Sequence, residues 1–239
     1  GEGNFSPAEA NIFVTGSNEW KKFAAWPPAE TENKNLYLHP NGKLAFEKVG
    51  RTDSWDEYVS DPSSPVPYQN GVQASRTREY MIDDQRFASR RPDVKTYQTD
   101  VLKEDITLTG PVLANLVVST TGTDADYVVK LIDVYPDGKA YNLDETIQRL
   151  RYREGYDKEV FMEKNKVYKV DLTPMVTSNY FAAGHKIRIE VSSSNFPRFD
   201  RNLNTGGNNY DESKGIVVEN KIHHSKLYPT VIKLPFIKQ

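Results

Sequence analysis

Residues 184–202 read GHKIRIEVSSSNFPRFDRN, and the first half of this stretch decides the fold class. From residue 186 to residue 191 a charged side chain alternates with an apolar one. This period of two is typical of a strand with one buried face and one face toward water. Three serines then interrupt the alternation, and a loop-like segment runs from residue 195 to residue 211. The stretch therefore predicts a half-buried strand that ends in a long loop.

Other short apolar runs continue this pattern along the chain. They cover residues 10–15, 35–38, 106–109, 112–119, 127–135 and 228–234, with turn-forming residues such as Pro136-Asp137-Gly138 between them. Only residues 172–176 and 213–220 carry helical signals, and both segments are short. Many short strands with almost no segment of helical period predict an all-β sandwich with few short helices.

The charge balance and composition exclude several classes of function. The 239 residues include 31 basic and 33 acidic side chains, for a formal net charge of −2, whereas nucleic-acid and anionic-membrane binders usually carry a basic excess. No apolar run approaches the roughly 20 residues that a membrane-spanning helix needs. The absence of cysteine excludes disulfides, thiolate nucleophiles and cysteine-ligated zinc. We therefore predict no nucleic-acid partner and no membrane partner.

Two long segments do not fit regular strands, and their composition favours ordered packing. Residues 61–91 contain three prolines followed by a polar run rich in arginine and aspartate, and residues 195–211 are loop material throughout. Long loops in a compact domain are usually either functional or disordered. Because Phe87, Phe196 and Phe199 are interleaved with the charges, we expect both segments to be ordered.

The sequence shows no catalytic machinery of its own. A serine hydrolase of the α/β type places its nucleophile in a G-x-S-x-G turn, and that motif does not occur. The adjacent His223 and His224 would point to opposite faces of a strand, which disfavours joint metal ligation, and His185 is expected in an exposed turn. Asp124 and Asp126 could hold calcium, but a solvated turn is the preferred interpretation because no calcium-binding loop follows. We predict no catalytic residue, no metal site and no cofactor in this chain.

Several segments, taken together, resemble a known family of hydrolases. They read KLIDVYPDG at residues 130–138, LRYRE at 150–154 and the opening stretch at 184–202, with DQR at 84–86 and RPDV at 91–94. In this combination and order they resemble the C-terminal domain of the X-Pro dipeptidyl-peptidase-like, or CocE/NonD, serine hydrolases. That group includes cocaine esterases, α-amino acid ester hydrolases and glutaryl-7-ACA acylase-type enzymes. TGSNEW at 15–20 and WP at 26–27 resemble the start of the same domain, so the resemblance covers about residues 11–238.

The resemblance implies an architecture in which an α/β-hydrolase domain with a helical cap precedes a non-catalytic jelly-roll domain of galactose-binding-like type. Residues 11–239 would form that single C-terminal domain, and residues 1–10 would be an interdomain linker or an artificial end. The catalytic serine, aspartate and histidine would belong to the preceding domain. The implied partners are the hydrolase and cap domains of the same chain, with a homo-oligomer also open. Family habit indicates a secreted or periplasmic location.

The resemblance also implies which part of the domain lies near the active site of its parent. In esterase members a segment just before the DQR element helps to wall the acyl pocket, and the matching region is about residues 73–81. Loops that carry arginine and aromatic side chains are also typical of buried interface centres. The expected interdomain or pocket-shaping residues are Gln73, Arg76, Tyr80, Arg86, Phe87, Asn195, Phe196, Phe199, Asp200 and Arg201. Asp200 and Arg201 could equally form a local pair that pins their own loop.

A carbohydrate-binding module is the alternative function, because galactose-binding-like sandwiches host many sugar binders and fold alone does not decide function. Sugar sites usually expose aromatic platforms, for which Trp20, Trp26 and Trp55 are the candidates. Packing is the preferred role for Trp20 and Trp26, which lie in the family-like opening. A free-standing protein, not attached to a hydrolase, is a third interpretation.

Overall fold

The computed structural model describes residues 7–71 and 77–237, and it confirms the all-β prediction. Its helices are short: η1 (Pro40–Gly42), η2 (Glu79–Met81), α1 (Arg86–Ser89) and η3 (Leu150–Tyr152). The strands are β1 (Ala10–Val14), β2 (Glu19–Phe23), β3 (Thr31–His39), β4 (Lys43–Ala45), β5 (Trp55–Ser60), β6 (Lys95–Gln98), β7 (Ile106–Thr120), β8 (Asp126–Val134), β9 (Ala140–Arg149), β10 (Tyr168–Asp171), β11 (Met175–Phe181), β12 (Lys186–Ser192), β13 (Val218–His223) and β14 (Val231–Ile237).

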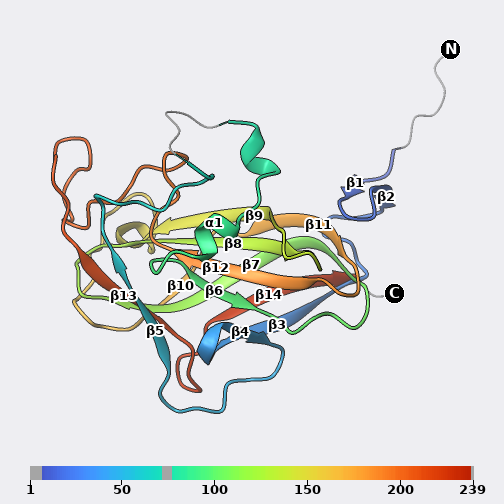
Figure 1. The fold of residues 1–239 in the computed structure, drawn as a ribbon, viewed down its shortest axis with the longest axis horizontal. Coiled ribbons are helices and arrows are strands. Elements are labelled where there is room, and N and C mark those ends of the chain that lie inside the picture. The colour runs from blue at the N-terminus through green and yellow to red at the C-terminus, as the bar shows by residue number, and fades with distance from the viewer. Residues whose placement is uncertain (1–6, 72–76, 238–239) are drawn as a thin grey trace.

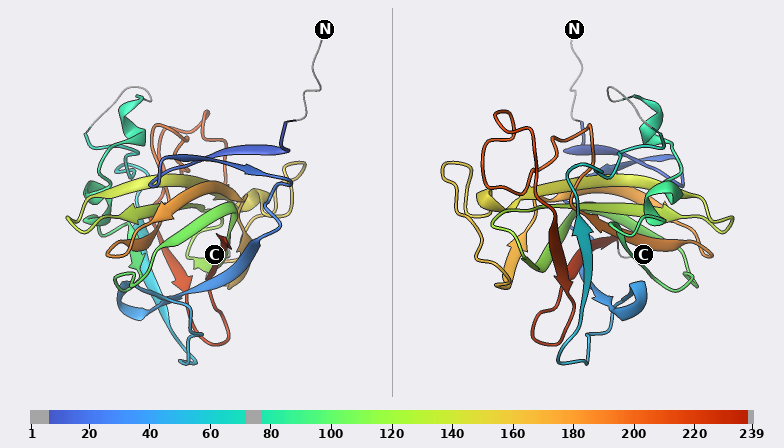
Figure 2. Two further views of the ribbon diagram at one scale, coloured as in Figure 1. Left: turned by 90° about the vertical axis from the view of Figure 1, so that its right-hand side faces the viewer. Right: turned by 60° about the vertical axis from the view of Figure 1, so that its left-hand side comes forward.

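Two groups of strands share one hydrophobic core, which makes the domain a β-sandwich (Figures 1 and 2). One group runs β9-β8-β12-β6, and the other runs β5-β13-β7-β14-β3-β4, with β10 and β11 also paired to β7. A single parallel bridge between β4 and β6 links the two groups. Leu131 and Ile189 from the first group and Leu116 and Ile232 from the second are buried in the same core.

The strand predicted from residues 186–191 is present as β12, but both of its faces are buried. Its apolar side chains lie in the core as predicted, whereas Arg188 and Glu190, predicted to face water, are only 8% and 3% exposed. On the outer face Gln85 accepts a hydrogen bond from Lys130, which lies directly opposite Glu190 on β8. The prediction of a wet face is therefore wrong, because a distant stretch, residues 77–94, covers this face and excludes water. We call this stretch the covering segment.

Both predicted helical turns are wrong. Residues 172–176 lead instead into β11, which pairs with β7 from Met175 onward, and the Leu172 N–H donates to the Ala114 carbonyl at 3.0 Å. Residues 213–220 form a loop that runs into β13. Pairing with a buried neighbouring strand outweighs weak local helix propensity.

The loop of residues 195–211 is attached to the sandwich through Asn202, which donates to two buried aspartates that are also paired with arginines. Arg151 Nε donates to Asp124 at 2.7 Å, Arg149 Nε donates to Asp126 at 2.9 Å, and Asn202 Nδ2 donates to both carboxylates at 2.8 Å. Both aspartates are fully buried, so the predicted solvated turn is wrong. Across residues 7–71 and 77–237, no group of three or more side chains is placed to hold a metal ion.

Candidate interdomain surface

Two segments that the sequence singled out separately lie side by side in the structure. The Phe196 N–H donates to the Val66 carbonyl at 2.9 Å, and the Tyr68 N–H donates to the Phe196 carbonyl at 3.0 Å. Pro67 and Phe196 thereby form an isolated parallel bridge, and the Phe196 side chain stays partly exposed. The described parts of the two long loops are therefore joined to each other at residues 66–68 and 196.

Arg198, which the sequence did not single out, joins several of the predicted residues. Its Nη1 donates to the Tyr80 hydroxyl at 2.7 Å and lies 2.6 Å from Glu145 Oε1 on β9. Its guanidinium carbon lies 5.3 Å from the ring centroid of Tyr80 and 5.4 Å from that of Phe199. Tyr80 and Phe199 are thus held around a partly exposed arginine that pairs with a buried carboxylate, an arrangement with no local sequence pattern to mark it.

The other predicted residues take several roles. Arg86 is exposed and pairs with Asp84, whose Oδ1 accepts the Ala140 N–H at 3.2 Å. Phe87 is half-buried beside it on α1. Asn195 is fully buried, and its side-chain amide has no hydrogen-bond partner among the described residues.

Asp200 and Arg201 bond to different parts of the chain. The Tyr210 hydroxyl donates to Asp200, and Arg201 Nη1 donates to the Pro62 carbonyl at 2.9 Å. Within the described ranges the two side chains form no ion pair with each other, so the alternative of a local pair is wrong. Gln73 and Arg76 lie outside the described residues.

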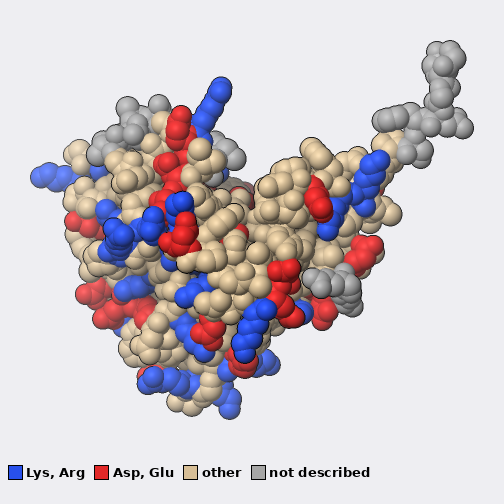
Figure 3. Space-filling view, turned by 45° about the vertical axis from the view of Figure 1, so that its right-hand side comes forward, with Lys and Arg blue, Asp and Glu red and all other residues tan. Residues whose placement is uncertain are grey.

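An apolar groove of about 600 Å³ opens beside this surface. Phe13, Ile82, Tyr135, Tyr141 and Val176 line much of it, and they come from β1, the covering segment, the β8–β9 turn region and β11. Ile82 is 74% exposed and Val176 is 53% exposed. Figure 3 shows the molecule hollowed on this side, between the β1–β2 hairpin and the rest of the sandwich. Sequence patterns did not mark this groove, because its walls come from four separate segments.

The hairpin that forms one wall of the groove is fixed firmly to β11. Thr15 donates through its N–H to the Ser178 carbonyl at 3.1 Å and through its hydroxyl to Asn179 at 2.6 Å. Gly16 has a φ of +86°, and a Cβ built there would lie 2.3 Å from the Tyr180 carbonyl oxygen. Only glycine permits this approach, so the sequence TGSNEW at 15–20 specifies the close contact.

A short polar relay lies on the floor of the groove. Asn179 donates to Asp133 at 3.4 Å, and His185 Nδ1 lies 2.8 Å from the other oxygen of Asp133. Burial raises the pKa of Asp133, and the hydrogen bond from His185 partly offsets that effect. The rings of His185 and Tyr135 are in tilted contact, 4.3 Å apart between centroids. The prediction of an exposed turn histidine is wrong, because its side chain is 12% exposed and is engaged by Asp133.

Away from the apolar groove, around strands β5 and β13, the structure brings a serine, a histidine and an aspartate together. Ser54 Oγ lies 3.0 Å from His224 Nδ1, and His224 Nε2 lies 2.9 Å from Asp56 Oδ2, which also accepts the Tyr97 hydroxyl. His224 is 1% exposed, and neither it nor Ser54 lines the apolar groove. A nucleophile needs a position for the reacting carbonyl next to it. This relay fastens β5 to β6 and β13, and its histidine is shielded from solvent.

The tryptophans do not form a shared sugar-binding platform. Trp20 is 72% exposed on β2, where its ring contacts Phe13 edge-on at 5.5 Å, so it packs on the hairpin and not in the core. Trp55 lies on β5, where the Lys221 ammonium covers its ring at 4.8 Å. Trp26 lies in the segment between β2 and β3. The three rings belong to separate elements, and one ring face is already occupied.

The sandwich of the described residues, with its exposed apolar groove and its buried Ser–His–Asp relay, does not have the architecture of an α/β-hydrolase catalytic domain. The family model for the X-Pro dipeptidyl-peptidase C-terminal non-catalytic domain matches residues 6–233. The chain belongs to this family, the non-catalytic C-terminal domain of CocE/NonD hydrolases.

Similar proteins are longer hydrolases. The chain is 37% identical to a cocaine esterase of Rhodococcus sp. (strain MB1 Bresler), an alignment that covers 97% of the chain and 42% of the esterase. An aminopeptidase from a marine sediment Thaumarchaeota archaeon is 33% identical with a TM-score of 0.93, over 99% of the chain and 41% of that protein. An α-amino acid ester hydrolase is 33% identical with a TM-score of 0.88, over 95% and 40%. The chain thus spans about two fifths of the length of these proteins.

Proposed function

We propose that this chain packs on the α/β-hydrolase and cap domains of its own polypeptide and forms part of the wall of their active-site pocket. The exposed apolar groove beside the Tyr80–Arg198 cluster carries the proposal. Apolar side chains gathered in one exposed groove are typical of interaction sites, whereas singly scattered ones are normal on protein surfaces. Ile82 and Val176, both more than half exposed, would be buried by such a neighbour.

The chemistry of the parent is proposed to be acyl transfer through a serine nucleophile. The similar proteins are named as an esterase, an ester hydrolase and an aminopeptidase, and all three activities cleave an ester or amide at a carbonyl carbon. That shared chemistry supports a parent of the ester, amide or dipeptidyl-peptidase class. This chain would contribute no catalytic group to it.

Side-chain contacts hold the covering segment in place on the sandwich, and this supports a role in shaping the pocket. Tyr80 is buried and fixed by Arg198, which is itself anchored by the buried Glu145. A wall that shapes a substrate pocket must hold its geometry to within a fraction of an ångström. The segment next to residues 72–76 therefore has the support that such a wall needs.

Aspartate substitutions on the groove test the packing proposal in the full-length protein. Ile82→Asp and Val176→Asp would place an unpaired charge in the interdomain contact, a costly burial. We expect either variant to lower the melting temperature and the kcat/KM of the full-length protein, while the isolated chain keeps its melting temperature because both side chains are exposed there. Val59→Asp is the matched control, since Val59 is 49% exposed on β5, away from the groove.

The proposal would be wrong if the groove variants left the full-length protein as stable and active as the Val59→Asp control. A second measurement, titration of the isolated chain into the separately produced hydrolase and cap domains, should show binding that either groove variant weakens. Absence of binding together with unchanged activity of the full-length variants would exclude the packing role.

A further inference from the structure

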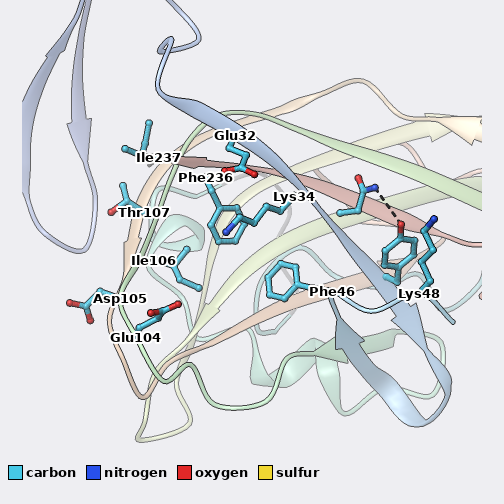
Figure 4. A pocket seen from close by; sticks show the side chains of 12 residues that line it. Glu32, Lys34, Phe46, Lys48, Glu104, Asp105, Ile106, Thr107, Phe236 and Ile237 are labelled. Carbon is cyan, nitrogen blue, oxygen red and sulfur yellow. Dashed lines mark hydrogen bonds between the residues drawn. The ribbon is translucent and has the colours of Figure 1, made fainter. Parts of the chain in front are cut away.

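Two grooves of the domain differ in the charges that line them. A groove of about 720 Å³ between β3, β7 and β14 carries side chains of both signs, among them Glu32, Lys34, Lys48 and Glu104 (Figure 4). The apolar groove shares no residue with it, and Asp133 is the one charged side chain among the described residues that line it. A partner that fills the apolar groove therefore meets a carboxyl group without a neighbouring basic side chain in the lining.

Asp133 ends a row of core side chains on β8. Val129 and Leu131 lie in the core, and residue 133 points to the same face because side chains alternate along a strand. Asp133 also lies opposite Ile187 of β12, which is another core residue. Burial of a carboxyl group in such a place costs free energy unless partners compensate it. The chemistry of those partners therefore indicates what the groove is built to receive.

Contacts inside the domain use only part of the capacity of Asp133. His185 Nδ1 lies 2.8 Å from Oδ1, and Asn179 Nδ2 donates to Oδ2 at the long distance of 3.4 Å. An ionised carboxylate accepts about four hydrogen bonds. Burial raises the pKa of Asp133 in spite of both contacts. The domain by itself thus leaves acceptor capacity at the floor of the groove.

The walls of the groove suit an alkyl stem that carries a flat cationic head. Ile82 and Val176 expose apolar surface on the walls, along which an arginine buries its methylene groups. The rings of Tyr135 and Tyr141 meet edge to face at 5.2 Å between centroids, and tyrosine rings attract guanidinium groups. A guanidinium also donates in parallel to a carboxylate, which an ammonium does less well. The lining therefore fits an arginine side chain.

We propose that an arginine of the hydrolase or cap domain of the same polypeptide enters the apolar groove and pairs with Asp133. This inference rests on the packing proposed above and adds the chemistry of the contact, which is charge complementarity at the floor and apolar contact along the walls. Arginine is among the residues on which binding at interfaces most depends. Removing one partner of a charge pair that is shut off from water weakens an interface strongly.

The main competing interpretation is that Asp133 serves this domain alone by holding His185, so that an apolar side chain fills the groove. Both interpretations predict that an aspartate introduced at Ile82 or Val176 disrupts the packing. They differ for Asp133→Asn, which keeps the shape of the side chain and removes its charge. An arginine in the groove makes this change more harmful in the full-length protein than in the isolated chain, whereas a purely internal role makes it equally harmful in both.

Asp133→Asn, made in the isolated chain and in the full-length protein, separates the two interpretations. The melting temperature of the full-length protein should fall further than that of the isolated chain. Binding of the isolated chain to the separately produced hydrolase and cap domains should weaken about tenfold or more. Asp137→Asn is the matched control and should change neither result, because the Asp137 side chain is 54% exposed and pairs with the exposed Lys139 in the turn after β8.

Two small compounds test the preference for a cation on the isolated chain. n-Butylguanidinium and n-butylurea have nearly the same shape and differ in charge. In a nuclear magnetic resonance titration that follows the Val176 and Asn179 amides, the guanidinium compound should bind about tenfold or more tightly, and Asp133→Asn should remove the difference.

The proposal would be overturned if the two compounds did not differ in affinity, or if Asp133→Asn lowered both melting temperatures equally. Continued destabilisation of the full-length protein by Ile82→Asp would show in that case that the packing stands and that only the arginine is excluded. Loss of both effects would exclude the packing as well.

Discussion

Arg198 Nη1 lies 2.6 Å from Glu145 Oε1 and donates to the Tyr80 hydroxyl at 2.7 Å. Glu145 lies on β9, Tyr80 on η2 and Arg198 in the loop after β12. One arginine therefore joins three segments that are distant in sequence. The Glu145 side chain is 2% exposed, so loss of the arginine would weaken the pairing of a buried carboxylate. The positions of Tyr80 and Phe199 in the candidate interdomain surface depend on this pair.

Arg198→Met should destabilise the isolated domain by about 2–4 kcal/mol, because the buried Glu145 would keep only Lys130, at 3.6 Å, and Asn142 as partners among the described residues. Methionine preserves much of the side-chain volume, so loss of packing contributes little. Urea unfolding at neutral pH measures the change. Combining it with Glu145→Gln should recover part of the loss; equal destabilisation in the single and double variants would show that charge is not the cause.

Glu190→Gln should stabilise the domain at neutral and alkaline pH. Burial raises the pKa of Glu190 from 4.5 to about 7, although Lys130 and Arg188 oppose the shift. A carboxyl with a raised folded pKa contributes stability that is fully present below its unfolded pKa and is lost as pH rises through the folded value. The wild-type chain should therefore weaken between about pH 4.5 and pH 7 relative to the variant.

Thermal melting across this pH range tests the role of Glu190. The two melting temperatures should converge on acidification and separate above neutrality. Glu30→Gln, at an exposed position outside the strands, is the matched control and should not change the curve. A constant difference between Glu190→Gln and the wild type at every pH would contradict the prediction.

Asp56→Asn should remove stability that the wild-type chain has at neutral pH. Burial of Asp56 opposes its ionisation, but the hydrogen bonds from His224 and Tyr97 outweigh burial and lower its pKa below 3.8. Such a group contributes stability above its unfolded pKa that disappears as pH falls through the folded value. Denaturant unfolding at neutral pH and near pH 3 should show a penalty for the variant that shrinks in acid.

The Ser54–His224–Asp56 relay should be inert toward acyl substrates. A fluorophosphonate probe, which labels activated serines, should not label the isolated chain, and Ser54→Ala should leave that result unchanged. His224 is buried, so its imidazole cannot reach a substrate. Stoichiometric labelling lost in Ser54→Ala would show instead that this site is a nucleophile.

The strand at residues 186–192 shows what local sequence could predict. Alternation of charged and apolar residues located β12 and its core-facing side chains, because side chains on a strand alternate in direction. The burial of Glu190 was not predictable in this way. It depends on Gln85 and the rest of the covering segment, about a hundred residues earlier, and no periodicity encodes which distant segment lies over a face.

The candidate interdomain surface also contains some residues that the sequence predicted and others that only the structure revealed. Composition selected Phe196 and Phe199 as aromatic loop residues, and the family resemblance selected Tyr80. The structure places Tyr80 and Phe199 around Arg198, and Phe196 beside Val66. Arg198 and the groove residues Ile82 and Val176 were not predicted, because each is ordinary in its own sequence context. Their importance arises only from neighbours that folding supplies.

By itself the sequence determined an all-β sandwich, the absence of a G-x-S-x-G nucleophile turn and membership of a non-catalytic hydrolase domain family. These follow from period-two patterning, turn residues and short ordered motifs, which are properties of neighbouring residues. The tertiary structure alone decided where the apolar groove opens and which charges are buried. These features depend on contacts between residues far apart in the chain, and local physical chemistry does not determine those contacts.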